Sequence, residues 1–335
     1  MIKSSLEPSN QKFIFIIPKS HRHLHLFDDL EEESNVELIF VNQKSVIKPL
    51  ELLRKIHTSY TVNKFIKLPF HNLWYEKVNL EALSENDYVV VLDGALTILN
   101  AKKTNKLVKT NKFSLVLLLI NSLNAESVSM VEVKDKIKKF HWNDIYSFDP
   151  QDCKENNFKQ LGLSYYSKKE ILNENKISTD IFFVGGLKGN RENDILNTFE
   201  FLNSNGCSTN FQLMISGVRK FKQQKYEDVI EYIRGKWIPY NQILKQVVSS
   251  NCILEIVQKG QTGPSLRYFE AVCYNKKLLT NNKYTKNFPF YNSKYMKIFD
   301  DISDIDVDWV KKEEKIDYHY DEDFSPKQLL NKLIN

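Results

Sequence analysis

The sequence lacks several features that would place a protein in a class at once. Its 335 residues include 4 cysteines, Cys153, Cys207, Cys252 and Cys273, and no two of them form a CxxC pair. That scatter argues against a zinc site or a disulfide framework and fits a reducing cytosol. The longest apolar run, FSLVLLLINSL at 113–123, is shorter than the ~20 residues that span a bilayer. It reads as a buried helix or as a strand followed by a helix.

Familiar ligand motifs are also missing. The glycine-containing stretch at 183–196 has neither the GxxxxGK[ST] of a P-loop nor the spaced GxGxxG of a dinucleotide fold. No DxD motif stands in a loop suited to a metal, because the acidic YDEDF at 320–324 comes late and should be solvated. The N-terminus shows no signal-peptide pattern. With a net charge of +5 and no nucleic-acid module signature, the sequence predicts a soluble or peripheral protein that binds neither metal nor nucleic acid.

What the sequence has instead is an alternation of short apolar strands and helical patterns. Strand patterns are clear at 12–18, 36–41 and 87–94, and a new series begins at 179–186 and continues at 211–217. Strands separated by helices of this kind form parallel sheets with right-handed crossovers. The sequence therefore predicts an α/β protein of two similar domains.

A glycine loop opens the second series of strands. In FVGGLKGNRENDIL, a strand ends in Gly185-Gly186, and Lys188 and Arg191 lead into a helix. Glycines let the backbone approach a ligand closely, and a helix start with two cations suits a phosphate. The alternative is an ordinary glycine turn with solvated basic side chains.

A second unusual stretch is QKGQTGPSLRYFEAV at 258–272. The Gly-Pro step predicts that a helix begins there, and Arg267 and Glu270, three residues apart, would share one face of it. A helix N-terminus beside two charged side chains suits an anion that carries hydroxyl groups. The alternative is a Gly-Pro turn followed by a surface ion pair. Both stretches follow strands, so both should lie on the carboxyl edge of one sheet, where α/β proteins bind ligands.

Together, FVGGLKG, FQLMISG and the stretch from IPYNQILK to KKLLTNN resemble the nucleotide-binding half of a GT-B glycosyltransferase. The resemblance is close over roughly 180–285, and it extends to bacterial capsule and lipopolysaccharide enzymes through YSFDPQD at 146–152. It implies a GT-B-like chain with two Rossmann-like domains facing each other across a cleft. We expect an acceptor-binding domain at 1–165, a nucleotide-sugar-binding domain at 166–315, and a C-terminal helix in 316–335 that packs back towards the first domain.

The resemblance also implies roles for individual residues. Glu270 would hold the nucleotide ribose, and Gly263 and Ser265 in the first turn of the helix would face the donor diphosphate. Many retaining members carry a second glutamate eight positions earlier, where this chain has Thr262. Gln258 or Glu255 could take its place only with a different loop path. The stereochemical outcome is therefore open, and inversion with Asp93 as the base is our hypothesis. The expected donor-binding residues are Gly185, Gly186, Lys188, Arg191, Tyr240, Gln258, Thr262, Gly263, Ser265 and Glu270.

The implied activity is transfer of a sugar from a nucleotide-diphosphate donor to a saccharide acceptor in bacterial capsule or lipopolysaccharide synthesis. The reaction releases a diphosphate, whose charge a helix N-terminus and basic side chains, Arg267 first among them, can stabilise without metal or cofactor. The enzyme would be cytoplasmic, either free or peripheral on the inner membrane face. Two alternatives remain open: a nucleotide-sugar 2-epimerase of the same fold, and a non-catalytic subunit of a polysaccharide assembly complex.

The first half of the chain should supply the acceptor site. Asp93 ends the strongest strand there and is the expected acceptor base, with a helix cap or turn residue as the alternative. His21, His71 and Trp74 are the expected acceptor-binding residues, and for the last two the favoured alternative is a packed aromatic cluster. The lysine-rich stretch at 101–113 is either a solvated helix face or a patch that attracts an anionic membrane.

Overall fold

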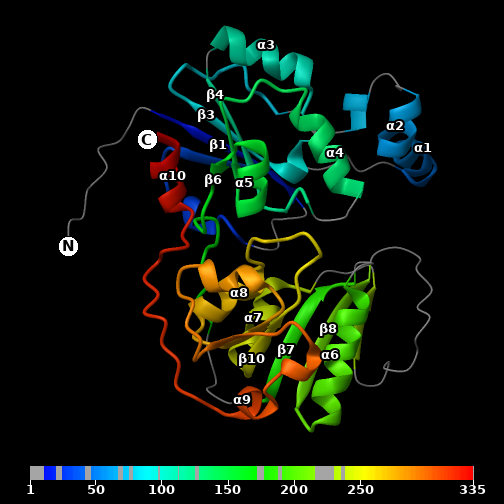
Figure 1. Cartoon of the computed structure of the whole chain (residues 1–335). Coiled ribbons are helices and arrows are strands. Elements are labelled where there is room, and N and C mark those ends of the chain that lie inside the picture. The colour runs from blue at the N-terminus through cyan, green and yellow to red at the C-terminus, as the bar shows by residue number, and fades with distance from the viewer. Residues whose placement is uncertain are drawn as a thin grey trace. The chain divides into compact units, whose positions relative to one another are not determined.

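The computed structural model forms two compact units, which are treated separately below. Unit 1 comprises Met1–Tyr165 and Pro326–Asn335, and unit 2 comprises Tyr166–Ser325. Figure 1 shows one sheet in each unit, with helices packed on it. The structure describes residues 11–19, 25–41, 47–66, 71–74, 78–96, 99–111, 113–124, 128–171, 177–187, 191–215, 230–234 and 238–334.

Unit 1 is built on a parallel sheet. Its described strands are β1 (Phe13–Pro18), β2 (Val36–Val41), β3 (Tyr88–Leu92), β4 (Ser114–Leu119), β5 (Asp144–Ser147) and β6 (Lys159–Gln160). They lie in the order β2-β1-β3-β4-β5-β6, and every pair is parallel. All six side chains of β1 are buried, as expected for a parallel strand that is covered on both faces. Most of the apolar run at 113–123 thus forms strand β4, which ends at Leu119.

Helices surround this sheet. The described ones are η2 (Asp28–Leu30), α1 (Lys48–Thr58), α2 (Tyr60–Phe65), η3 (His71–Trp74), η4 (Asp93–Ala95), α3 (Ala101–Asn111), α4 (Val128–Ile137), α5 (Pro150–Asn156) and α10 (Lys327–Ile334). The sequence sets the start of α5, since Asp149 accepts hydrogen bonds from two amides of its first turn and Pro150 stands at the first position. Helix α10 belongs to unit 1, where Lys332 Nζ donates to Leu161 O at 3.0 Å and Ser164 Oγ at 3.1 Å.

Unit 2 repeats the arrangement. Its described strands are β7 (Thr179–Gly186), β8 (Thr209–Ile215), β9 (Ile230–Arg234), β10 (Ser250–Glu255), β11 (Lys277–Thr280) and β12 (Met296–Ile298). Their order is β12-β11-β10-β7-β8-β9, again parallel throughout. The described helices are α6 (Glu192–Ser204), α7 (Tyr240–Val248), α8 (Leu266–Cys273), η6 (Lys283–Asn287), η7 (Ile302–Asp304) and α9 (Val307–Lys311). The predicted α/β class with two parallel sheets is confirmed.

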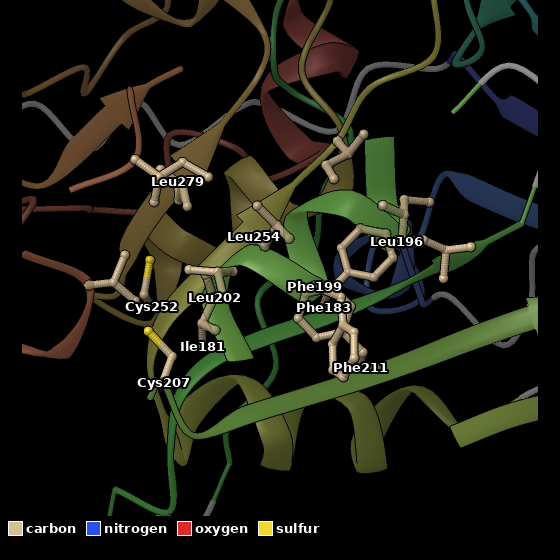
Figure 2. Packing of buried hydrophobic residues seen from close by; sticks show 14 of the residues in the cluster. Ile181, Phe183, Leu196, Phe199, Leu202, Cys207, Phe211, Cys252, Leu254 and Leu279 are labelled. Atoms are coloured by element: carbon tan, nitrogen blue, oxygen red, sulfur yellow. The ribbon is translucent and has the colours of Figure 1, made fainter. Parts of the chain in front are cut away.

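The core of unit 2 fixes where these helices lie. Figure 2 shows Phe183 of β7, Phe199 of α6 and Phe211 of β8 packed together. The ring centroids of Phe183 and Phe211 are 5.4 Å apart, and those of Phe199 and Phe211 are 5.1 Å apart in an edge-to-face arrangement. Buried aromatic contacts of this kind contribute about 0.5–1.5 kcal/mol beyond their area. They hold α6 against the sheet, so the loop between β7 and α6 has fixed ends.

Within the described residues, no helix combines the length and the apolar character needed to cross a bilayer.

Candidate functional site

The candidate site lies on one edge of the sheet in unit 2. Strands β7 and β10 are adjacent and parallel, so the loops that follow them leave the sheet at the same edge. Strand β7 ends in Gly185 and Gly186 and is followed by α6, and strand β10 is followed by α8. The two stretches singled out in the sequence therefore meet at the carboxyl edge, as their strand patterns predict.

Arg191, the residue before α6, connects the two loops. Its Nη1 donates to Ile256 O after β10 at 2.7 Å, and its Nη2 donates to Gly186 O at the end of β7 at 2.8 Å. Burial, and to a lesser extent the nearby Arg267, lowers the pKa of Arg191 to about 10. Arg191 therefore joins the ends of β7 and β10 by hydrogen bonds and is not a solvated cation. Its predicted contact with the donor stays a proposal.

There is little room for a side chain at Gly185. A Cβ built on Gly185 would stand 3.0 Å from a ring carbon of Phe183 and 3.3 Å from Arg191 Nη2. A larger residue at 185 would thus fit only if the Phe183 ring and Arg191 shifted by a few tenths of an ångström. Lys188, the other predicted cation of this loop, lies outside the described residues.

Helix α8 starts close to the Gly-Pro step, as predicted, with Ser265 as its N-cap. Ser265 Oγ accepts from the amide of Arg267 at 3.2 Å. The amide of Ser265 in turn donates to Glu255 Oε1 at 2.9 Å, and Thr280 Oγ1 donates to Glu255 Oε2 at 2.6 Å. Glu255 is fully buried, and burial raises the pKa of its carboxyl group. This carboxylate, which the sequence offered only as a possible substitute for the glutamate replaced by Thr262, links the ends of β10 and β11 to the start of α8.

Arg267 and Glu270 form a buried pair on α8. Arg267 Nη2 donates to Glu270 Oε1 at 2.6 Å, and Tyr240 OH donates to the same oxygen at 2.9 Å. The Tyr166 hydroxyl lies 2.9 Å from that of Tyr240 and extends the chain of hydrogen bonds. The side chains of Arg267 and Glu270 are 10% and 0% exposed, so the alternative of a surface ion pair is wrong.

Two polar atoms of this pair are left over. Glu270 Oε2 and Arg267 Nη1 are buried and have no hydrogen-bond partner among the described residues. A buried polar atom without a partner costs free energy, about 1–3 kcal/mol for an ordinary group and more for a charged one. Glu270 Oε2 can accept a hydrogen bond from a hydroxyl group of a ligand. Arg267 Nη1 can donate one to an anionic oxygen of a ligand.

The protonation of Glu270 couples stability to pH. Burial raises the pKa of its carboxyl group from 4.5 to about 7, although Arg267 and Tyr240 oppose the rise. Between these values the folded state keeps a proton that the unfolded state has lost, so rising pH favours unfolding. We expect the free energy of unfolding to fall by on the order of 3 kcal/mol between about pH 4.5 and 7, relative to Glu270→Gln. The free energy of unfolding is measured by urea unfolding at several pH values. The same pH dependence in wild type and Glu270→Gln would contradict this expectation.

The remaining predicted donor residues lie around the pair. Tyr240, the first residue of α7, is buried, as are Thr262 and Gly263, while Gln258 is half-buried. The loop is closed by its own hydrogen bonds and by one from Asn282, whose Nδ2 donates to Gly263 O at 3.2 Å. The approach to α8 is therefore an ordered turn.

In unit 1, Asp93 lies at the end of β3 and starts η4. Its side chain is fully buried. Oδ2 accepts from the amides of Ile120 at 3.3 Å and Asn121 at 3.1 Å, and from Asn121 Nδ2 at 3.0 Å, while Oδ1 accepts from the Gly94 amide at 2.6 Å. These bonds join the loops that follow β3 and β4 and support the turn-residue interpretation. The role of acceptor base stays a prediction.

The expected acceptor-binding residues are only partly described. His21 lies outside the described residues, and the backbone of His71 is in η3. Trp74 Nε1 donates to His57 Nδ1 at 2.5 Å, and the two rings meet edge to face with centroids 5.8 Å apart. This contact agrees with a packed aromatic cluster, and sugar stacking by Trp74 stays a prediction. In the described part of the chain, no three His, Cys, Asp or Glu side chains form a group that could hold a metal ion.

Two parallel α/β units of this topology in one chain define the GT-B fold, and solved structures share it. An alpha-glucosyltransferase in complex with UDP-glucose and DNA containing an abasic site has a TM-score of 0.53 at 12% identity, covering 97% of this chain and 99% of that chain. The apo form of the lipopolysaccharide outer core galactosyltransferase WaaB has a TM-score of 0.50 at 12% identity, with coverage of 97% and 99%.

A third structure shows that the fold is not confined to transferases. UDP-N-acetylglucosamine 2-epimerase from Rickettsia bellii has a TM-score of 0.50 at 10% identity, covering 97% of this chain and 96% of that chain. No protein-family model matches the chain, and no curated protein matches it in sequence. At these identities the likeness establishes the fold and leaves the activity to be argued from the site.

Proposed function

We propose that this protein is a glycosyltransferase that takes a sugar from a nucleotide-diphosphate donor held by unit 2. The observation that carries the proposal is the buried Arg267–Glu270 pair at the start of α8, with one acceptor and one donor atom unpartnered. Glu270 Oε2 would accept a hydrogen bond from a ribose hydroxyl, and Arg267 Nη1 would donate to a phosphate oxygen. Once Glu270 has lost the proton that its raised pKa of about 7 retains, both contacts are charge-assisted and therefore strong.

The surroundings of the pair suit the release of a diphosphate. Transfer leaves negative charge on the leaving group, and fixed donors that are already oriented stabilise it without reorganisation. The amide end of α8, the backbone at Gly263 and the guanidinium of Arg267 would supply them. Glu255 restricts this role, because its carboxylate already accepts from the Ser265 amide. We therefore assign most of the stabilisation to Arg267 and to the loop before Ser265.

Glu270 is fully buried, so a ribose reaches Oε2 only if the covering side chains move apart. Donor binding should consequently change the exposure of the α8 start.

We propose a saccharide acceptor bound by unit 1 and a pathway in bacterial surface polysaccharide synthesis. The sequence resemblance to capsule and lipopolysaccharide enzymes supports both. The fold does not identify the acceptor or the pathway, because it is shared by transferases whose names differ in this respect. One structure contains DNA, and the other enzyme is named for the lipopolysaccharide outer core.

A 2-epimerase is the second candidate, and the likeness to the Rickettsia bellii enzyme favours it specifically. An epimerase would convert the donor sugar without any acceptor. A transferase leaves the sugar of the unconsumed donor unchanged.

Incubation with UDP-, GDP-, CDP- and ADP-sugars, followed by mass spectrometry and proton NMR, separates these functions. We expect release of nucleoside diphosphate that depends on an added saccharide, and we expect most of the rate to survive EDTA because basic groups take the place of a metal. Epimerised donor in the absence of acceptor would identify the second candidate. Activity that EDTA abolishes and manganese restores would refute the metal-independent mechanism.

A further inference from the structure

Two fully buried tyrosines form a chain of hydroxyl groups that ends on Glu270. Tyr240 OH donates to Glu270 Oε1 at 2.9 Å, and the Tyr166 hydroxyl lies 2.9 Å from that of Tyr240. A phenol has one proton to donate. Because Tyr240 gives its proton to Glu270, Tyr166 is the donor to Tyr240. The chain of hydrogen bonds therefore runs in one direction, from Tyr166 through Tyr240 to Oε1.

The core of unit 2 holds both rings in place. The Tyr166 amide donates to Phe324 O at 3.0 Å, and the Tyr166 ring stacks on that of Phe269 with centroids 5.3 Å apart and an interplanar angle of 19°. Tyr240 is the first residue of α7, which contacts α8 (Figure 1). The Tyr240 hydroxyl therefore holds Glu270 Oε1 in one position.

Arg267 meets Glu270 at one oxygen only. Arg267 Nη2 donates to Glu270 Oε1 at 2.6 Å, while Arg267 Nη1 and Glu270 Oε2 are buried without a partner among the described residues. An arginine and a carboxylate frequently pair through two parallel hydrogen bonds. Such a bidentate pair would give both atoms a partner and remove the free-energy cost of burying them alone. The structure keeps the less satisfied arrangement.

Tyr240 explains this single contact. Turning the Glu270 carboxyl group about its Cγ–Cδ bond to bring Oε2 towards Arg267 Nη1 also moves Oε1, which breaks the bond from the Tyr240 hydroxyl. Since Tyr166 in turn donates to that hydroxyl, the two tyrosines together oppose the turn. Arrangements that lower stability are kept in proteins where activity needs them. The two unpartnered atoms therefore point to a binding role for the open pair.

We propose that Tyr166 and Tyr240 are positioning residues that keep the Arg267–Glu270 pair open for the donor. By holding Oε1, they leave Oε2 for a ribose hydroxyl and Nη1 for a phosphate oxygen. Without the two hydroxyl groups, the pair closes into a bidentate ion pair that offers neither atom to a ligand. The inference rests on the proposed function, because the open pair matters only if unit 2 binds a nucleoside diphosphate. Tyr240 then acts through Glu270 and not by contact with the donor.

The double variant Tyr166→Phe/Tyr240→Phe tests the inference on the full chain, because it removes both hydroxyl groups at once. We expect its midpoint of urea unfolding to equal or exceed that of wild type, since the closed pair satisfies Arg267 Nη1 and Glu270 Oε2. In calorimetric titration, its affinity for whichever of UDP, GDP, CDP and ADP binds wild type most tightly should fall about tenfold or more. A purely structural role would lower the midpoint instead.

Tyr318→Phe is the matched control. The Tyr318 hydroxyl is also buried in unit 2, and it donates to the backbone oxygen of Lys276 at 3.1 Å. We expect a lower urea midpoint in this variant, because a buried hydrogen bond is lost, together with wild-type nucleotide affinity. The control thus loses stability alone, whereas the double variant loses affinity alone.

Three results would overturn the inference and leave the proposed function in place. They are wild-type nucleotide affinity in the double variant, a urea midpoint of the double variant below that of wild type, and an equal loss of affinity in Tyr318→Phe. In each case Glu270→Gln should still weaken nucleotide binding. If wild type binds none of the four nucleotides, the proposed function fails and the inference fails with it.

Discussion

Glu270→Ala should abolish measurable sugar transfer and lower the free energy of unfolding by about 3–5 kcal/mol. The stability loss follows from the buried pair, because the substitution leaves Arg267 charged, buried and without its acceptor. It also removes the acceptor of the Tyr240 hydroxyl, which is itself fully buried. Loss of a charge-assisted contact to the donor should weaken nucleotide binding by about 1–3 kcal/mol, or roughly 5- to 150-fold.

Two variants separate stability from binding. Glu270→Gln keeps an acceptor for Tyr240 and should remain folded at room temperature, so calorimetric titration with the donor nucleotide can be carried out on it. Glu85→Ala removes an exposed glutamate of unit 1 and should change neither quantity. Wild-type nucleotide affinity in folded Glu270→Gln would show that the ribose assignment is wrong, even if Glu270→Ala unfolds as expected.

Asp93→Asn should destabilise unit 1 by about 3 kcal/mol. An asparagine side chain has one acceptor oxygen where the carboxylate has two. Its NH2 group would therefore face either the donors now at Oδ2, namely the amides of Ile120 and Asn121 and the Asn121 side chain, or the Gly94 amide now at Oδ1. At least one of these buried donors loses its acceptor. A lower midpoint in urea unfolding, with an unchanged dependence on denaturant, is the expected measurement.

The hypothesis that Asp93 is the acceptor base adds a second expectation. Turnover per folded molecule would fall about 10²–10⁴-fold, while nucleotide binding to unit 2 stays at the wild-type level. Folded Asp93→Asn protein with wild-type turnover would remove Asp93 from the mechanism. A product that keeps the anomeric configuration of the donor would remove the need for a base.

The strands were predictable because their patterns are local. Runs such as FIFIIP and TDIFFVGG are short, apolar and rich in β-branched or aromatic residues, and they form β1 and β7. The run at 113–123 was ambiguous, since periodicity does not distinguish a buried strand from a buried helix. Its pairing between β3 and β5 in the sheet decides for the strand, and no local pattern encodes that pairing.

The supports of the candidate site were not predictable for the same reason. Spacing alone placed Arg267 and Glu270 on one face of α8, but it did not show that the pair is buried against Tyr240 and Tyr166. Tyr240 stands 30 residues before Glu270 and was expected only as a donor-binding residue. Tyr166 stands about 100 residues before Glu270, in a segment with no distinguishing motif. The contacts of Arg191 and Glu255 were hidden for the same reason, because Arg191 donates to Ile256 O, and Glu255 accepts from Ser265 and Thr280.

Hydrogen–deuterium exchange with and without the nucleotide sugar that the protein turns over tests the central claim most directly, because it locates the donor. We expect the amides at Gly185–Leu187 and those from Thr262 to Glu270 to exchange more slowly with donor bound, and this protection to disappear in Glu270→Ala that remains folded. Protection confined to unit 1, or no protection with any nucleotide sugar, would contradict a donor site on the carboxyl edge of unit 2.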